Sequence, residues 1–304
     1  MPLPQTFKAL VDVVEPDYAI ITNVGRAHLQ GFGSFEGVIH TKGELYDFMR
    51  ANHGLGNTDN GKTLQGGKAP LSCVFIDSEN PYLNGIAQGL NLVRYGCKAD
   101  DQLWVSGRVD SCSPMLNFTW RHNDGATLGA PHATQTHLIG EYNITNMLAA
   151  VSIGLYFGVP ADSIVKALSA YVPSNNRSQF EQTKDNRLIV DAYNANPTSM
   201  AAALDNFAQI KAEHKMVIIG DMKELGVVSH DEHQKIVDML KALDIETVWL
   251  VGAEFEHCDT PQSFRLFDNV EQVKEAIAAD KPHGKYILVK GSNSTKLFEL
   301  PELL

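Results

Sequence analysis

The 304-residue sequence lacks long apolar runs, paired cysteine motifs and an excess of positive charge. With no run of about 18 apolar residues and no apolar segment before a small-residue cleavage site near its start, we expect neither a membrane span nor a signal peptide. The four cysteines show no C-x-x-C pair or zinc-like spacing, which favours free thiols and a cytoplasmic protein. A formal net charge of -11 disfavours nucleic acid and anionic membranes as partners. An anionic ligand therefore has to be held by local cations or by a metal.

The composition is typical of a soluble globular protein, with 44% hydrophobic and 20% charged residues. A chain of this length accommodates two ordinary domains. The Pro/Asn/Ser-rich segment 172–178 is the best connector, because the periodicity of the sequence changes across it. We therefore expect one domain over residues 1–172 and a second over residues 173–304.

The first domain is predicted to be a partial central ATPase-type α/β domain that opens late in a βαβ series. Apolar residues at helical spacing over 6–14 end before Pro16, and the run 18–22 is typical of a buried strand. Further strands are expected at 71–77, 102–106, 115–121 and 136–139, further helices at 42–50, 143–157 and 162–170, and loops at 52–70 and 122–135.

The second domain has a more regular pattern. Its short apolar runs are 188–190, 216–219, 247–251 and 286–289, and helical stretches of ordinary length separate them. This alternation predicts a C-terminal Rossmann-like, doubly wound parallel sheet, so the fold class of the chain is α/β.

Polar residues follow the predicted strand at 18–22. Asn23 and His28 come directly after it, and Lys42 lies on the helix that follows. Ligands of open α/β sheets bind beyond the carboxyl ends of parallel strands, so Asn23 and His28 are where a nucleotide or metal is expected. The alternative is a surface loop with a solvated histidine.

Two glycine patterns look like nucleotide loops but lack the right context. Gly31–Gly37 has G-x-G-x-x-x-G spacing and no acidic partner about 20 residues on, so we reject a dinucleotide loop. Gly56–Thr63 matches G-x-x-x-x-G-K-[ST], yet a helix precedes it and a Gly/Pro-rich stretch follows, whereas a P-loop leaves a strand and enters a helix. We expect a chance match in a surface insertion, with a relocated P-loop as the alternative.

Two asparagines stand at the start of the helix expected at 143–157. Asn143 and Asn146 are three residues apart, so both side chains lie on one helix face and can hydrogen-bond a planar polar ring. Helix capping by Asn143 is the alternative, but it does not account for Asn146. Arg177, near the end of the connector, is able to reach a phosphate across an interdomain cleft or to form an ordinary surface salt bridge.

A polar cluster follows the first strand of the second domain. Asp191, Asn194 and Asn196 come after the run 188–190 and before the helix-starting Pro197. Folding alone requires only one capping residue at such a place. An acid and two amides at the carboxyl end of a buried strand are therefore typical of a binding site.

A lysine follows the last apolar run of the chain. Lys290, Gly291 and Ser292 stand at the same predicted sheet edge, where the ammonium group and the adjacent backbone amides suit a carboxylate. A loop-exposed lysine without a ligand is the alternative.

Five blocks carry a resemblance to a known family: TNVGRAHLQGFGSFEGVIHTKGEL, GEYNITNMLAA, VDAYNANPTSM, GDMKELG and LVKGSN. In this order they closely resemble the Mur ligases, and the stretch YNANP resembles the MurF-type subgroup, which adds D-Ala-D-Ala to UDP-N-acetylmuramoyl-tripeptide. The resemblance implies ATP-dependent amide-bond synthesis for peptidoglycan, in which the peptide carboxylate forms an acyl phosphate and the dipeptide amine displaces phosphate. It also implies Mg²⁺, because two anions meet in the first step.

The resemblance also implies roles for individual residues. By motif position, His28 and Lys42 look like catalytic metal ligands, with Lys42 carbamylated, because an imidazole and a carbamate oxygen suit Mg²⁺ whereas an ammonium group does not. The other implied residues are the nucleotide-binding Asn23, Asn143, Asn146, Arg177 and Asp191, and the dipeptide-binding Asn194, Asn196, Lys290, Gly291 and Ser292.

The resemblance covers the back part of the family's central domain and its whole C-terminal domain. The family's UDP-binding domain, P-loop and glutamate metal ligand, all expected before TNVGRAH, have no counterpart in these 304 residues. Phosphoryl transfer depends mostly on positioning and electrostatics, so we expect a truncated ligase that is inactive alone. The alternative is a non-catalytic module that still binds nucleotide or dipeptide.

Overall fold

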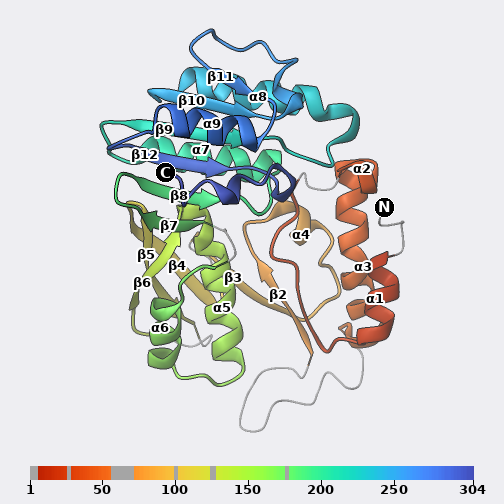
Figure 1. Cartoon of the computed structure of the whole chain (residues 1–304). Helices are drawn as coiled ribbons and strands as arrows, with labels where there is room; N and C mark the ends of the chain where they lie inside the picture. Colours follow the sequence, from red (N-terminus) through yellow and green to blue (C-terminus); the bar gives the residue numbers. More distant parts are fainter. Residues whose placement is uncertain (1–5, 26–28, 56–71, 99–101, 124–127, 175–177) are drawn as a thin grey trace.

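The computed structural model describes residues 6–25, 29–55, 72–98, 102–123, 128–174 and 178–304. Within these residues the strands form two sheets of six strands each. Figure 1 shows the second sheet above the first, with the chain passing from the lower to the upper part after α6.

The first sheet changes from parallel to antiparallel pairing across its width. Neighbouring strands from β1 to β4 are parallel, whereas β5 and β6 extend the sheet as antiparallel strands. The carboxyl ends of its parallel strands meet at one edge, so the segments after β1 and β2 lie at a common edge. The strands are β1 (Tyr18–Ile20), β2 (Cys73–Asp77), β3 (Leu92–Gly96), β4 (Val105–Cys112), β5 (Met115–His122) and β6 (His132–Ile139).

Helices cover both faces of this sheet. They are α1 (Thr6–Val14), α2 (Leu29–Phe32), α3 (Phe35–His53), α4 (Pro81–Gly85), the short η2 (Glu141–Asn143), α5 (Ile144–Tyr156) and α6 (Ala161–Ala170). Successive side chains of a strand point to opposite faces, so Cys73 and Phe75 of β2 enter the core with α5 while Val74 and Ile76 enter the core with α3. Each such apolar side chain contributes about 1.5–3 kcal/mol on full burial.

Helix α3 begins earlier than the periodicity predicts. Ser34 caps it, since its Oγ accepts a hydrogen bond of 3.1 Å from Gly37 N. Glu36 in the first turn, and Arg50 with His53 in the last, complement the helix dipole. The segment after Gly33 is therefore helical, which places Lys42 in the interior of α3.

The second sheet is almost entirely parallel. Its spatial order is β11-β10-β9-β12-β8-β7, and only the described edge strand β7 is antiparallel to its neighbour. Because β12 lies between β8 and β9, the chain crosses over within the sheet. The strands are β7 (Gln179–Gln182), β8 (Arg187–Asp191), β9 (Lys215–Gly220), β10 (Thr247–Val251), β11 (Arg265–Phe267) and β12 (Tyr286–Lys290).

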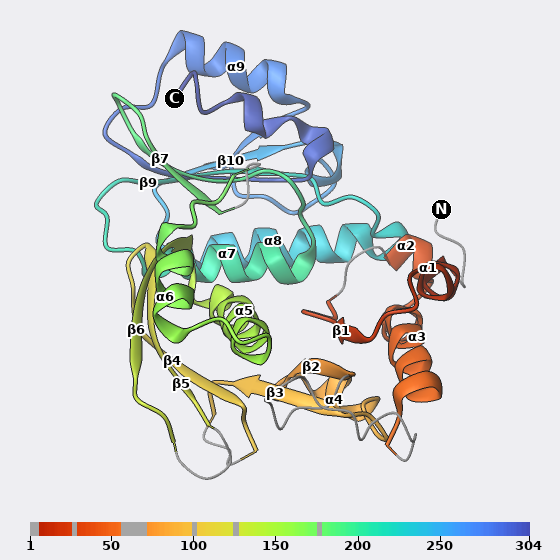
Figure 2. The same ribbon diagram turned by 90° about the horizontal axis from the view of Figure 1, so that it is seen from below.

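The second sheet is wound on both faces. Helices α7 (Pro197–Gln209) and α8 (Ser229–Ala242) pack on one face, and α9 (Val270–Ala279) packs on the other. Figure 2 shows α7 and α8 between the second sheet and the first domain. Ile139 at the end of β6 belongs to the core under these helices, so the two domains share apolar contacts.

The structure confirms the α/β class and most predicted elements. Helix α1 has the predicted bounds, and the four apolar runs of the second domain are β8, β9, β10 and β12. Several expectations need correction. The antiparallel β7 makes the second sheet mixed, and β6 starts at His132, inside the predicted loop 122–135. The strand expected at 102–106 is β4 at Val105–Cys112, and β3 at Leu92–Gly96 has no counterpart among the predicted strands. All four cysteines are free thiols, and no helix among the described residues is long and apolar enough to span a membrane.

Candidate functional site

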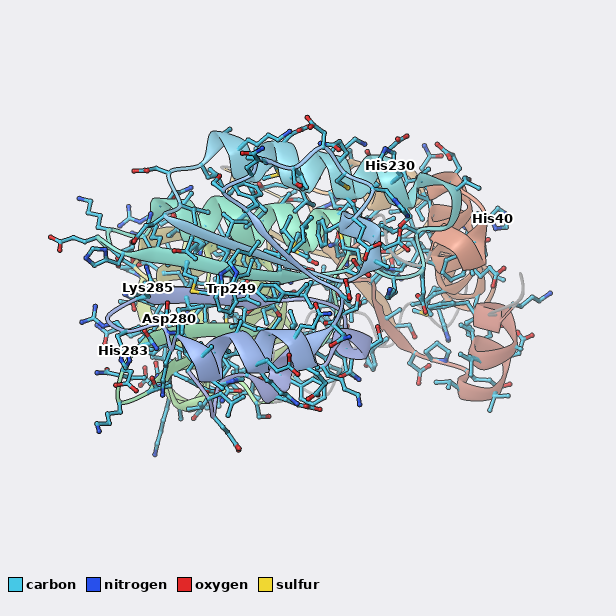
Figure 3. The ribbon with its side chains drawn as sticks, turned by 45° about the horizontal axis from the view of Figure 1, so that its top comes forward. His40, His230, Trp249, Asp280, His283 and Lys285 are labelled. Carbon is cyan, nitrogen blue, oxygen red and sulfur yellow. The ribbon has the colours of Figure 1, made fainter. Side chains whose placement is uncertain are left out.

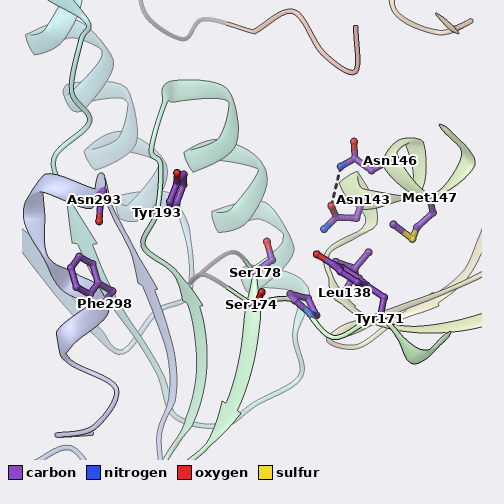
Figure 4. A pocket seen from close by; sticks show the side chains of 11 residues that line it. Leu138, Asn143, Asn146, Met147, Tyr171, Ser174, Ser178, Tyr193, Asn293 and Phe298 are labelled. Atoms are coloured by element: carbon purple, nitrogen blue, oxygen red, sulfur yellow. Dashed lines mark hydrogen bonds between the residues drawn. The ribbon is translucent and has the colours of Figure 1, made fainter. Parts of the chain in front are cut away.

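A cavity of about 780 Å³ lies between the two domains. Figure 4 shows Asn143 and Asn146 on one side of it, with Tyr193, Asn293 and Phe298 on the other. Tyr193 follows β8 and Asn293 follows β12, so the cavity lies at the carboxyl edge of the second sheet. Open α/β sheets bind their ligands at this edge.

The two asparagines form a hydrogen-bonded pair. Asn143 is buried, its Nδ2 donates to Ile139 O at 2.8 Å, and its Oδ1 accepts from Asn146 Nδ2 at 3.1 Å. The side chain of Asn143 makes no capping hydrogen bond to α5, so the capping alternative is wrong. Asn143 instead orients Asn146, which is exposed at the cavity. Their contact with a nucleotide base stays a prediction.

Asp191 and Lys290 form an ion pair. They end the neighbouring strands β8 and β12 in direct register, and Lys290 Nζ lies 2.5 Å from Asp191 Oδ2. The lysine side chain is 0% exposed and the carboxylate 16% exposed. The alternative of a loop-exposed lysine is therefore wrong. The sequence assigned these two side chains to different ligands, whereas the fold joins them.

Gly291 is required by close packing of two strand ends. A Cβ at this position would lie 2.8 Å from Thr295 Oγ1, closer than real Cβ contacts, and 3.1 Å from Gly220 Cα, tighter than most of them. The next residue, Ser292, is buried and its Oγ accepts a hydrogen bond from Lys223 N at 3.2 Å. The segment after β12 is thus tied to the loop after β9.

The loop after β9 contains a buried acidic side chain, Asp221. Its Oδ2 lies 3.0 Å from Lys223 Nζ. Its Oδ1 has no hydrogen-bond partner among the described residues. The block GDMKELG follows the apolar run 216–219, but only the fold shows that its acid is inside the protein.

His233 holds this loop from α8. Its imidazole is fully buried, Nε2 accepts from Met222 N at 3.0 Å, and Nδ1 donates to Ser229 O at 2.8 Å. These two contacts fit the neutral ring, with one nitrogen donating and the other accepting. Burial lowers the pKa of His233, which also favours the neutral form. No sequence pattern pointed to this residue.

Asn196 has a structural role that its sequence context already suggested. Its Oδ1 accepts from Ser199 N at 2.9 Å, and Ser199 Oγ accepts from Asn196 N at 3.2 Å, which is a capping box on α7 with Pro197 in the first turn. Asn194 is exposed, and neither asparagine lines the cavity. Tyr193, between the predicted Asp191 and Asn194, does line it.

Lys42 lies at the edge of the first sheet. Its Nζ donates to Asn23 O at 2.7 Å, so the backbone of Asn23, not its exposed side chain, makes this contact. Burial lowers the pKa of Lys42, which makes its neutral amine easier to form. His28, expected at the same edge, lies outside the described residues. So do Arg177, expected to reach a phosphate from the connector, and the Gly56–Thr63 pattern.

The edge that carries Asn23 and Lys42 meets the second domain. A Cβ placed on Gly25 would lie 3.7 Å from Thr198 Oγ1, in the first turn of α7. Helix α2 contacts η3 (Gly226–Val228), directly after the loop of Asp221. Figure 2 shows α2 beside one end of α8, and Figure 3 labels His230 in the first turn of that helix. The carboxyl edge of the first sheet and the segments at the carboxyl edge of the second sheet therefore meet at the boundary between the two domains.

Comparison with known families agrees with this arrangement of domains. The Mur ligase middle domain matches residues 3–154, and the Mur ligase glutamate ligase domain matches residues 176–293. The chain belongs to the Mur ligase family.

Proteins similar to this chain include MurF enzymes. The UDP-N-acetylmuramoyl-tripeptide–D-alanyl-D-alanine ligase of Treponema pallidum is 28% identical over 304 residues, covering 98% of this chain and 60% of that protein. A crystal structure of MurF from Acinetobacter baumannii superposes with a TM-score of 0.76 at 24% identity, over 99% of this chain and 62% of that one. MurF from Thermotoga maritima in complex with ADP has a TM-score of 0.77 at 19% identity, over 99% of this chain and 64% of that one.

This chain spans about 60% of the length of these relatives. The predicted resemblance to Mur ligases of the MurF type is thereby confirmed, and so is the fold, with the middle and C-terminal domains of the family. The individual site residues stay predictions. Among the described residues, no group of three or more His, Cys, Asp or Glu side chains is placed to hold a metal ion.

Proposed function

We propose that this chain provides the middle and C-terminal part of an ATP-dependent ligase that joins D-Ala-D-Ala to UDP-N-acetylmuramoyl-tripeptide. The interdomain cavity is the observation that carries the proposal, because the curated relatives that match nearly the whole chain are MurF ligases and the cavity lies where such a fold binds ligands. Its volume of about 780 Å³ is in the usual range for small-molecule sites.

The cavity suits a nucleotide. Its lining combines apolar and aromatic side chains, among them Met147, Tyr193 and Phe298, with the amides of Asn143 and Asn146. A planar base needs both kinds of contact: apolar surface for its faces and paired donors and acceptors for its edge. We propose that the two asparagines bind the adenine of ATP.

Other residues complete this nucleotide site in the proposal. Asp191 binds the ribose, Arg177 approaches the phosphates and Asn23 lies at the first-domain edge. Of these three assignments, that of Asp191 has the strongest support, because Asp191 ends β8 close to Ser178 and Tyr193, which line the cavity.

We propose His28 and Lys42 as the residues that hold Mg²⁺, which would neutralise the reacting carboxylate and phosphate. Lys42 fits this role, since carbamylation requires a neutral amine and burial lowers the pKa of Lys42. The carbamate that results is an anionic oxygen ligand, which Mg²⁺ prefers.

For the dipeptide, we propose the second-domain edge formed by Asn194, Asn196, Gly291 and Ser292. Of these four residues, Asn194 is the best supported as a dipeptide contact, because its side chain is exposed close to the end of β8. Lys290 is buried against Asp191, so we assign it an indirect contribution. In the proposed reaction the peptide carboxylate oxygen attacks the γ-phosphorus and ADP leaves; the dipeptide nitrogen then attacks the acyl carbon and phosphate leaves.

We also propose that the boundary between the two domains lies between residues 172 and 173. We further propose that the protein acts in the cytoplasm on small-molecule substrates and binds neither nucleic acid nor membranes. The division is supported by where the elements lie: α6 ends at Ala170 and β7 starts at Gln179. The net charge of -11 supports the choice of partners.

Titration calorimetry of the 304-residue chain with Mg-ATP tests the nucleotide site. We expect binding that weakens about five- to tenfold in Asn146→Ala, because one amide hydrogen bond contributes roughly 1 kcal/mol. Asn117→Ala, on β5 away from the cavity, is the matched control. Equal affinities of the two variants would contradict the assignment.

A phosphate-release assay distinguishes the ligase from a second candidate, a non-catalytic binding module. The sequence holds a P-loop pattern only at Gly56–Thr63, without the usual strand and helix around it. We therefore expect the chain alone, given all three substrates, to release no phosphate. Activity restored by adding the upstream family segments supports the ligase; binding of Mg-ATP or D-Ala-D-Ala without any such activity supports the module.

A further inference from the structure

A continuous path of polar contacts joins the two domains beside the cavity. Lys290 Nζ contacts Asp191 Oδ2 at 2.5 Å, and Asp191 Oδ1 accepts from Ser178 N at 3.4 Å. Ser178 Oγ and Tyr142 Oη are then 2.8 Å apart. The path starts at the end of β12 and finishes in η2 of the first domain.

The backbone holds each end of this path in place. Lys290 and Asp191 are register partners in β12 and β8, so their contact is built into the sheet. At the other end, Gly140 has a φ of +92°, and a Cβ there would lie 2.3 Å from the Tyr142 ring. Only glycine allows Tyr142 to lie over the backbone in this way.

The middle of the path is a residue in an unfavourable conformation. Ser178 has a φ of +46°, a left-handed geometry that is uncommon for any residue except glycine. Such a conformation persists only where surrounding contacts hold it, and Ser178 is buried with hydrogen bonds on both sides. The Tyr142 hydroxyl stays protonated, since burial and then the charge of Asp191 raise its pKa to about 12.

We propose that Tyr142 and Lys290 are positioning residues that set the angle between the two domains through Ser178 and Asp191. The proposal rests on the cavity being the nucleotide site proposed above. Tyr142 is followed directly by Asn143, while Ser178 itself lines the cavity, so a shift along the path changes the spacing of its two walls. Cys112 Sγ and Asn206 Oδ1 make a weaker contact across the same division, 3.8 Å long.

Removing the Tyr142 hydroxyl in the whole chain is the central test. Tyr142→Phe should weaken ADP binding about three- to tenfold, as expected for one lost hydrogen bond. Small-angle X-ray scattering of the ligand-free variant should show a larger radius of gyration, because the domains open. Tyr286→Phe is the matched control, since the Tyr286 hydroxyl is buried with no partner among the described residues.

Ser178→Gly removes the other half of the same hydrogen bond and tolerates a positive φ. In a double-mutant cycle, Tyr142→Phe with Ser178→Gly should weaken ADP binding no more than Tyr142→Phe alone. Additive losses, or scattering identical to the parent for both single variants, would overturn the proposal.

Lys290→Met tests the far end of the path. It should open the domains in the same scattering measurement, and Lys290→Met combined with Asp191→Asn should restore part of the closure because the unpaired charge is gone. If Lys290→Met folds and its radius of gyration equals that of the parent, Lys290 has no positioning role. If Lys290→Met unfolds, the double variant replaces it: a radius of gyration between those of the parent and Tyr142→Phe supports the positioning role, and one equal to the parent's contradicts it. If no variant or parent binds ADP, the proposed nucleotide site fails, whereas the scattering still decides the domain angle.

Discussion

The carboxyl edges of the two sheets are built differently. At the second sheet, Lys290, Asp221 and Ser292 are all buried and each is bound to another side chain or backbone group of the same edge. At the first sheet, the Asn23 side chain is exposed and Lys42 contacts only a backbone carbonyl among the described groups. The second edge is thus preorganised by its own ion pairs, while the first keeps a lysine with a lowered pKa available for a ligand.

Replacing the two lysines should give the largest contrast. Lys290→Met leaves Asp191 without its cation, and we expect a loss of about 3 kcal/mol in the free energy of unfolding. Lys42→Met removes a partly buried charge that has no acidic partner among the described residues, so we expect a change within about 1 kcal/mol. Urea unfolding at neutral pH measures both. Similar losses in the two variants would show that the edges do not differ in this way.

Substitutions at two glycines, one in each region, test how tightly the two regions are packed. Gly252 has a φ of +122°, and a Cβ there would lie 2.3 Å from the Asp221 carboxylate, so Gly252→Ala should cost about 2–3 kcal/mol. Gly33 has a φ of +78° with nothing within 4 Å of its Cβ position, so Gly33→Ala should cost only about 1 kcal/mol. Thermal unfolding ranks the two variants. The opposite order would contradict the tighter packing of the second edge.

The two asparagines after β8 are expected to have different roles: Asn196 stabilises the fold, and Asn194 is available for binding. Asn196→Ala removes the cap of α7 and should destabilise the protein by about 1 kcal/mol. Asn194→Ala should change stability by less than about 0.5 kcal/mol, because the side chain is exposed. Chemical denaturation measures each variant. A stability loss in Asn194→Ala as large as in Asn196→Ala would show that Asn194 also supports the fold.

A further expected effect is the pH dependence that His233 gives the second edge. Its pKa in the folded state is lowered below the ordinary value of 6.5, so the unfolded chain binds more protons as the pH falls below about 6.5. The stabilisation by neutral His233 is fully present above about pH 6.5 and decreases below it, by at most about 1.4 kcal/mol per pH unit.

Urea midpoints between about pH 7.5 and pH 5.5 measure this slope, which should be smaller in His233→Gln. His230→Gln, at an exposed position on the same helix, is the control. An unchanged slope in His233→Gln would mean that another group titrates in this range.

Much of the fold could be predicted because it depends on short-range patterns. Helix α1 has the predicted bounds, since its apolar spacing is strong and Pro16 follows it. Strand β9 is a continuous apolar run buried on both faces. By contrast, β7 is partly exposed and β11 has only three residues, so neither carries a clear pattern. These two segments form strands because they hydrogen-bond to β8 and β10, and their own sequences do not predict it.

The candidate site was predicted in part for the same reason. Asn143 and Asn146 share a helix face because helix geometry alone places residues three apart side by side. The burial of Lys290 could not be predicted, because a lysine after an apolar run reads equally well as a loop residue. Its partner Asp191 is 99 residues away in sequence and becomes its neighbour only through the register of β8 and β12.

The sequence by itself determined the family, the α/β class and the segments that carry polar residues to the sheet edges, because these depend on local motifs and periodicity. Only the tertiary structure decided which of those residues are exposed at the cavity and which are buried in ion pairs. The physical reason is that burial and charge pairing depend on contacts between distant segments. Tyr142, Ser178, Asp191 and Lys290 show this most clearly, since no local pattern relates them and the fold joins them into one path.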